Sequence, residues 1–327
     1  MMLDGKQARS DALSFDVATV ALRGMRPYQE DSLISSFPMG QTTGFAVLSD
    51  GMGGHAAGHV ASALVVAEIF TQLKLKEQLI EDGVLNIPAT LEEAAEATNA
   101  RVAAYIADHD EAANMGATLL SVVIRRDKLY WISVGDSPLL LYRDGALRQL
   151  NKDHSMAPEI DMMVKVGALT EEAGKAHPGR STLTSAILGD KIEKMDCPSR
   201  PVVLLPDDIL IAASDGLQFL SNTTIAKCLM ASKDAHSVDI ADSLMTAIEE
   251  LADPDQDNAA FIVIKTGIGQ AQDEAAVDLA DLPVLATADD AEEATTPAET
   301  VVASETTDDA PDERKAYWYR GQKYYRD

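Results

Sequence analysis

Three aspartates flank the most apolar segments of this chain. Each adjoins one apolar run: Asp50 follows 45–48, Asp215 follows 209–213, and Asp257 precedes 259–264. A carboxylate beside a buried strand costs free energy unless it is paired or binds a cation. Carboxylate and carbonyl oxygens are the ligands that Mg²⁺ and Mn²⁺ prefer. The pattern favours a divalent-cation centre over a solvated face, although an Asp-Gly pair after a strand is by itself also an ordinary turn.

A second group of charged residues follows the first predicted strand. Arg26 comes shortly before the adjacent acids Glu30 and Asp31, and Asp136 ends a later apolar run. The planar guanidinium of arginine binds two phosphate oxygens at once. An arginine here could therefore hold a phosphate while the acids face a cation. A surface ion pair is the alternative.

The elements that must position these residues alternate along residues 12–267. Strands are predicted at 17–22, 45–48, 118–124, 128–134, 139–142, 146–150, 202–205, 209–213 and 259–265, and helices at 61–78, 91–108 and 237–251. Residues 151–185 are polar and cannot be assigned. Strands in hairpins with helices in pairs favour an antiparallel α+β sandwich over a parallel doubly wound sheet.

Composition limits the class of protein. The chain has 327 residues, of which 46% are hydrophobic, so it can bury a large core. It contains no run of eighteen apolar residues and no signal segment, so we expect neither a membrane span nor secretion but a cytoplasmic protein. The net charge of -26 argues against general affinity for nucleic acid or anionic membranes. Cys197 and Cys228 fit neither a disulfide framework nor a metal motif, and we expect two reduced thiols.

The C-terminal part changes character twice. Residues 268–312 hold thirteen acidic and no basic residues, and this composition predicts a disordered acidic linker. Residues 313–327 then combine five aromatic with five basic residues. Such a tail is typical of a peptide that docks on a protein partner or back on the folded domain, and contact with nucleic acid is the less favoured alternative. We therefore predict a folded domain over 1–267, the linker, and a basic-aromatic tail.

Six short motifs occur in one order along the folded part. They are Arg26 with Glu30-Asp31, Asp50-Gly54, Gly116-Thr118, Gly135-Ser137, Ser214-Gly216 and Asp257-Asn258. In this order they resemble the bacterial branch of the metal-dependent serine/threonine protein phosphatases of type 2C. The resemblance does not cover residues 268–327. It implies a central β-sandwich of two antiparallel sheets, flanked by helix pairs, with a metal centre at one end.

The resemblance also implies a set of metal ligands. Asp50 would bridge two cations, and Asp215 and Asp257 would complete one of the two sites. Glu30 and the carbonyl of Gly51 would hold the other cation, in part through water. The cofactors would be two Mn²⁺ or Mg²⁺ ions per active site, with a third position available.

Three further residues receive roles from the same resemblance. Asp31 would be a ligand or an anchor for metal-bound water, and Asp136 would form the third, weaker metal position together with Asp215. Arg26 would grip the phosphate oxygens. Some members carry a histidine after the Asp-Gly pair, proposed as the general acid, where this chain has Met52. A thioether cannot donate a proton, so another group or water must do so.

The implied activity is hydrolysis of phosphoserine and phosphothreonine in proteins by a hydroxide that bridges the two metals, without a covalent intermediate. The implied partners are phosphoproteins, among them a bacterial Ser/Thr kinase and its targets. Two alternatives from other classes stay open: a catalytically silent member of the same fold, and a docking hub that acts through its tail. A phosphatase of small metabolites is a weaker alternative, since a metabolite cleft should hold more basic ligands than Arg26.

Overall fold

The computed structural model describes residues 13–53, 56–268, 316–319 and 322–325. The chain divides into two units, one before and one after residue 271, and each is described by itself. The predicted linker over 268–312 lies outside the described residues, except for its first residue.

The first unit is built on two antiparallel sheets. One sheet has the order β1 (Leu13–Leu22), β11 (Ala259–Ile268), β10 (Ile209–Ala213), β7 (Leu139–Arg143) and β8 (Ala146–Gln149). The other has the order β2 (Asp31–Ser36), β3 (Thr43–Met52), β5 (Leu119–Arg125), β6 (Lys128–Val134) and β9 (Val202–Val203), and β4 (Gly116–Ala117) pairs with the end of β3.

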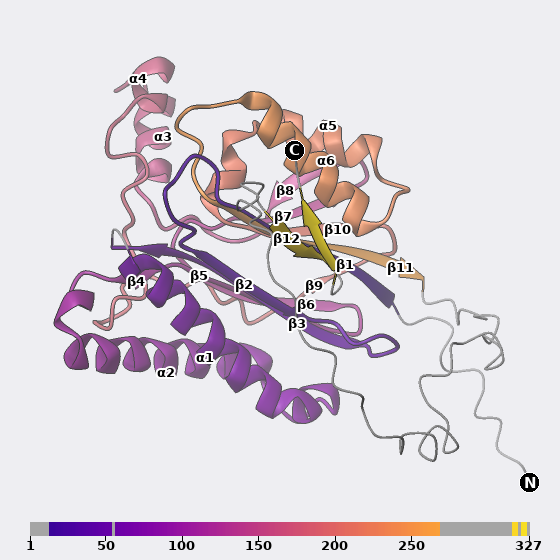
Figure 1. Cartoon of the computed structure of the whole chain (residues 1–327). Helices are drawn as coiled ribbons and strands as arrows, with labels where there is room; N and C mark the ends of the chain where they lie inside the picture. The colour runs from indigo at the N-terminus through magenta and orange to yellow at the C-terminus, as the bar shows by residue number, and fades with distance from the viewer. Residues whose placement is uncertain (1–12, 54–55, 269–315, 320–321, 326–327) are drawn as a thin grey trace, which may run out of the picture. The chain divides into compact units, whose positions relative to one another are not determined.

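Helix pairs cover the outer faces of the two sheets (Figure 1). Helices α1 (Ala56–Glu81) and α2 (Ile87–Asp108) pack on the β2–β3–β5–β6 sheet, whereas α5 (Asn222–Ala231) and α6 (Ser237–Leu251) pack on the other sheet. Two short helices, α3 (Ala157–Lys165) and α4 (Glu171–Lys175), stand apart from these layers at one end of the unit. Two 3-10 turns, Asp110–Ala112 and Asp215–Phe219, complete the helical elements that the described residues form.

Three apolar clusters hold the four layers together. Strand β3 contributes to two of them: Phe45 and Val47 face the α1–α2 layer, and Ala46 lies in the cluster between the sheets. The third cluster joins α5 and α6 to the other sheet and includes the fully buried Phe261. Because both faces of β3 are buried, its sequence is continuously apolar rather than alternating.

The α+β sandwich with two antiparallel sheets and flanking helix pairs is confirmed. Several elements differ from the prediction. Strand β2 and helix α5 were not predicted, and the unassigned residues 151–185 contain α3 and α4. Strand β2 is rich in serine and has only two adjacent apolar residues, Leu33 and Ile34, so it shows no alternation.

The second unit shows two short strands. Strands β12 (Ala316–Tyr319) and β13 (Gln322–Tyr325) pair in antiparallel register, with Tyr317 opposite Tyr324 and Trp318 opposite Lys323. A two-stranded hairpin alone is at best marginally stable in water. The docking role of this tail stays a prediction.

Candidate metal centre

Strand register brings the first two carboxylates together. In the β2–β3 pair, Asp31 lies opposite Asp50. Directly opposed residues of an antiparallel pair have their Cβ atoms only about 5 Å apart. Since no strand is predicted at 31–36, sequence reasoning had no means of finding this juxtaposition.

The other sheet delivers two more carboxylates at the same end of the sandwich. Asp215 follows β10, and Asp257 lies two residues before β11, with which β10 pairs. Ser214 fastens the two sheets together here: its N–H donates to the Ala260 carbonyl at 2.8 Å, and its Oγ donates to Asp31 Oδ2 at 2.7 Å. Apart from the place of Ser214 in the Ser-Asp-Gly motif, no feature of the sequence indicates this role.

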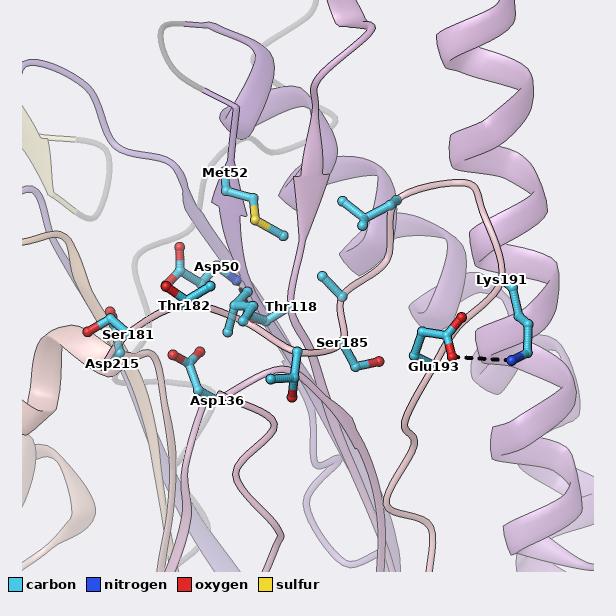
Figure 2. A pocket seen from close by; sticks show the side chains of 14 residues that line it. Asp50, Met52, Thr118, Asp136, Ser181, Thr182, Ser185, Lys191, Glu193 and Asp215 are labelled. Atoms are coloured by element: carbon cyan, nitrogen blue, oxygen red, sulfur yellow. Dashed lines mark hydrogen bonds and ion pairs between the residues drawn. The ribbon is translucent and has the colours of Figure 1, made fainter. Parts of the chain in front are cut away.

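A pocket of about 500 Å³ opens beside these strand ends. Figure 2 shows the carboxylates of Asp50, Asp136 and Asp215 at one end of the pocket, with Lys191 and Glu193 at the other. The remaining lining residues come from two places, the strand ends and the segment 181–193: Met52, Thr118, Ser181, Thr182, Leu183, Thr184, Ser185, Ala186 and Leu188. Of the predicted site residues, only those three aspartates line the pocket.

Burial and mutual proximity make these carboxyls hard to ionise. Asp31 and Asp215 lie close enough to Asp50 for their charges to act on its carboxyl. Burial, together with the nearby charges of Asp215 and Asp257, raises the pKa of Asp31 to about 7. Burial and the surrounding aspartates raise the pKa of Asp50 well above its ordinary value. Carboxylates on a solvated face would keep pKa values near the ordinary one, so these raised values indicate a buried and crowded cluster.

Burial and neighbouring carboxylates raise the pKa values of both Asp136 and Asp215. Burial and the charges of Asp215 and Asp153 raise the pKa of Asp136 to about 7. Burial and Asp257 also raise the pKa of Asp215, while contacts with Asp50 and Arg26 partly offset the effect. Asp153 was not among the predicted site residues.

Arg26 reaches the cluster from the loop between β1 and β2. Its Nη2 lies 2.6 Å from Asp257 Oδ2, and the Arg26 side chain is 56% exposed against 30% for Asp257. The predicted phosphate-binding arginine is thus paired with a predicted metal ligand. Its exposure leaves the guanidinium accessible from solvent.

The backbones of Glu30 and Gly51 lie in close contact with each other and with the first residues of α1. The N–H of Gly51 donates to the Glu30 carbonyl at 3.2 Å, and Ser62 Oγ donates to the same carbonyl at 2.5 Å. A Cβ on Gly51 would overlap the carbonyl of Gly58, and one on Gly58 would come within 2.6 Å of Glu30 Oε1. Glycine at both positions lets the Glu30 carboxylate approach the start of α1.

Asn258 holds the loop that carries Arg26 and Glu30. Its Oδ1 accepts the Glu30 N–H at 2.7 Å, and its Nδ2 donates to the carbonyls of Arg23 and Tyr28 at 2.7 and 2.9 Å. This buried amide satisfies three backbone groups that would otherwise lack partners. Sequence reasoning assigned Asn258 to a motif without giving it this function.

Thr118 fixes Asp50 through the backbone. The Thr118 N–H donates to the Asp50 carbonyl at 2.8 Å, and Thr118 Oγ1 accepts the Asp50 N–H at 2.9 Å. His154 fixes the turn before Asp136 in a similar way, because its Nδ1 accepts the Gly135 N–H at 3.3 Å. Burial lowers the pKa of His154, which favours the neutral ring that can accept this bond.

The donor set suits a hard divalent cation. Asp31 Oδ1 is buried and has no hydrogen-bond partner among the described residues, a state that costs about 1–3 kcal/mol unless a cation or its water fills the position. Within the described residues, no three His, Cys, Asp or Glu side chains are placed so that they could hold a metal ion as they stand. The carboxylates fit such a cation by the chemistry of their oxygens, not by a preformed coordination geometry.

A sequence profile described as protein phosphatase 2C matches residues 28–250. The serine/threonine protein phosphatase PstP of Mycobacterium tuberculosis is 33% identical over 195 residues, which cover 58% of this chain but only 35% of PstP. A putative protein phosphatase 2C-type of Streptococcus pyogenes is 30% identical over 225 residues, covering 67% of this chain and 87% of that protein.

Solved structures agree with the fold. The phosphatase PstP/Ppp of Mycobacterium tuberculosis is similar with a TM-score of 0.64 and 29% identity, covering 77% of this chain and 98% of that chain. The catalytic domain of PstP in complex with two manganese ions is similar with a TM-score of 0.61 and 28% identity, covering 78% of this chain and 99% of that chain.

Helix length and hydropathy bear on the question of a membrane span. Within the described ranges, none of the helices combines the length and the apolar character that crossing a bilayer requires.

Proposed function

Because this chain belongs to the protein phosphatase 2C family, we propose that it hydrolyses phosphoserine and phosphothreonine in proteins, using two divalent cations, Mn²⁺ or Mg²⁺. The observation that supports this most strongly is the meeting of carboxylates from both sheets beside one pocket. Asp31 and Asp50 come from one sheet and Asp215 and Asp257 from the other, and Ser214 joins the two groups.

Six residues would hold the two cations. They are Glu30, Asp31, Asp50, Gly51 through its carbonyl, Asp215 and Asp257, while Asp136 would serve a third, weaker position with Asp215. When bound, such cations lower the pKa of water and offset negative charge on phosphoryl oxygens. The aspartates would supply the negative charge that retains the cations, and the buried setting strengthens this attraction.

Arg26 is the residue we assign to the phosphate. Its guanidinium can offer two parallel N–H donors to two phosphoryl oxygens. Its Nη2 is paired with Asp257 Oδ2. Occupation of Asp257 by a cation would weaken this ion pair and leave the guanidinium available to the substrate.

Hydrolysis joins a water oxygen to phosphorus, breaks the bond from phosphorus to the substrate side-chain oxygen, and delivers a proton to that oxygen. Met52 lines the pocket, but its thioether cannot provide the proton. We assign this proton to water. The catalytically silent alternative would predict the loss of a central aspartate, whereas Asp50, Asp215 and Asp257 are all present.

We also propose the wider setting of this activity. The catalytic domain would comprise residues 1–267, followed by an acidic linker over 268–312 and a docking tail over 313–327. The protein would act in the cytoplasm on phosphoproteins, including a bacterial Ser/Thr kinase and its targets. The acidic chain favours protein partners over nucleic acid or anionic membranes.

Phosphate release from a phosphothreonine peptide tests the proposal. We expect turnover with Mn²⁺ or Mg²⁺, none with chelator, and a loss of at least about a hundredfold in Asp215→Asn, because one carboxylate charge is removed from the centre. Asp242→Asn, at an exposed position of α6, is the matched control and should behave as wild type. Folded protein without turnover under any metal condition would overturn the proposal.

A further inference from the structure

The pocket is larger than a phosphoryl group requires. Its volume of about 500 Å³ lies within the range of roughly 300–1,000 Å³ found for pockets that enclose whole drug-sized ligands. Its carboxylate end holds Asp50, Asp136 and Asp215, whereas Lys191 and Glu193 lie at the opposite end (Figure 2). A substrate phosphoryl group at the carboxylates would leave the rest of the pocket free for another part of the substrate.

Apolar side chains form one wall of the pocket between these two ends. Met52 and Gly116 oppose each other in the β3–β4 pair. A Cβ on Gly116 would collide with Leu188 and lie 3.1 Å from Met52 Cε, so Met52 and Leu188 adjoin across the bare glycine. Ala186 also lines the pocket. Together these residues make an apolar subsite next to Asp50.

Leu188 is fixed although it is exposed. The residue before it, Ile187, exchanges two backbone hydrogen bonds with Ala117, at 2.9 and 3.0 Å. The residue after it, Gly189, donates its N–H to Asn99 Oδ1 at 2.9 Å, and Asn99 Nδ2 donates to the Asp190 carbonyl. A residue whose backbone is anchored on both flanks requires little reordering of the chain when a ligand covers it.

The turn after Leu188 is built closely against α2. Gly189 has φ +83°, and a Cβ there would lie 2.8 Å from the Ala103 Cα. Asn99 is 7% exposed and is one of the few polar side chains on the buried face of α2. Single exposed leucines are common and need no explanation. Leu188 is 45% exposed and lines the pocket, and the buried amide of Asn99 binds the backbone of the two residues that follow it.

We propose that Met52, Leu188 and Ala186, over Gly116, bind an apolar side chain that directly neighbours the phosphorylated residue of the substrate. The substrate class is thus a phosphoprotein segment with leucine or a similar residue beside phosphothreonine or phosphoserine. Asn99 is a positioning residue for this wall. The ion pair Lys191–Glu193, with Nζ and Oε2 3.2 Å apart, is highly exposed and forms only the outer rim. The inference rests on the proposed phosphatase activity.

Peptide kinetics test the proposal. Three phosphothreonine peptides would be compared: one with leucine before the phosphothreonine, one with leucine after it, and one with serine on both sides. We expect one leucine peptide to exceed the serine peptide about five- to tenfold in kcat/KM, since burying part of a leucine has an effect of this size. In Leu188→Ala this ratio should fall to near one, and Leu188→Ile should restore most of it.

The matched control is Leu79→Ala, because Leu79 on α1 has the same exposed fraction of 45% but lies outside the pocket lining. It should keep the wild-type ratio. A ratio near one in wild type, or an unchanged ratio in Leu188→Ala, would overturn the subsite. Hydrolysis of p-nitrophenyl phosphate separates the two claims. If p-nitrophenyl phosphate is hydrolysed while all three peptides react at the same rate, the proposed subsite is wrong and the proposed phosphatase activity holds. If none of these substrates is hydrolysed, both proposals are wrong.

Discussion

The centre of this protein depends on polar residues that do no chemistry themselves. Ser214 donates to Asp31, Thr118 brackets the backbone of Asp50, and Asn258 binds three backbone groups around Arg26 and Glu30. Carboxyls with raised pKa values can be kept close together only if such bonds fix their supports. In the motifs Ser214-Gly216 and Asp257-Asn258, a proposed metal ligand thus stands beside a residue that positions the surrounding chain.

The pKa values of the carboxyls predict how the metal-free protein responds to pH. Asp31 and Asp136 titrate near 7 in the folded chain, against an ordinary value of 3.8. Between about pH 4 and 7 the folded state therefore keeps protons that the unfolded state releases, and stability falls as pH rises through this window. With chelator present, the urea midpoint should be higher at pH 5.5 than at pH 8.

Asp31→Asn is the control for this pH effect, since it removes one of the raised carboxyl titrations and should flatten the dependence. Added Mn²⁺ should raise the midpoint more at pH 8 than at pH 5.5, because the cation competes with protons for the carboxylates. A chelated protein that is more stable at pH 8, with the same slope in Asp31→Asn, would contradict the assignment.

Asn258→Ala should destabilise the fold by about 1–3 kcal/mol, because it removes the side-chain partner of partly buried backbone groups of Arg23, Tyr28 and Glu30. Urea unfolding measures this loss. Asn222→Ala, at an exposed position of α5, should change stability by less than about 0.5 kcal/mol. Equal effects of the two substitutions would show that the Asn258 bonds do not support the loop.

At the scale of elements, strand pairing decides which carboxylates meet. The β2–β3 register sets Asp31 against Asp50, and the β10–β11 pair brings the turn after β10 against the segment before β11. That second contact is tight, since a Cβ on Gly216 would overlap the carbonyl of Asn258. Close backbone approach is thus what glycine provides after Asp215.

Gly216→Ala should therefore lower the free energy of unfolding by about 1–3 kcal/mol, because neither backbone can yield without moving Asp215 or Asp257. Gly179→Ala is the matched control, as a Cβ there would make only ordinary contacts, the shortest at 3.4 Å. Thermal or urea unfolding compares the two variants. Indistinguishable midpoints would mean that the two turns are not packed as closely as described.

Much of the molecule was predictable because long apolar runs mark buried strands. The runs that became β3, β10 and β11 were recognised with the aspartates at their ends. Strand β2 was missed because its serines hide any alternation, and β2 is what places Asp31 beside Asp50. The pocket wall could not be foreseen either, since it depends on a tertiary contact of Asn99 with Gly189 ninety residues away.

At the scale of the whole first unit, the two-sheet sandwich gathers aspartates from both sheets at one end of its layers. Calorimetric titration of Mn²⁺ into the 327-residue chain tests most directly whether the aspartates at these strand ends form one cation centre. We predict two cations bound with high affinity in wild type and in Asp242→Asn. Asp50→Asn should weaken this binding by more than about tenfold, because it would remove the carboxylate that we propose both cations share. Binding of the same strength and stoichiometry in Asp50→Asn, or no binding by the folded wild type, would contradict the centre.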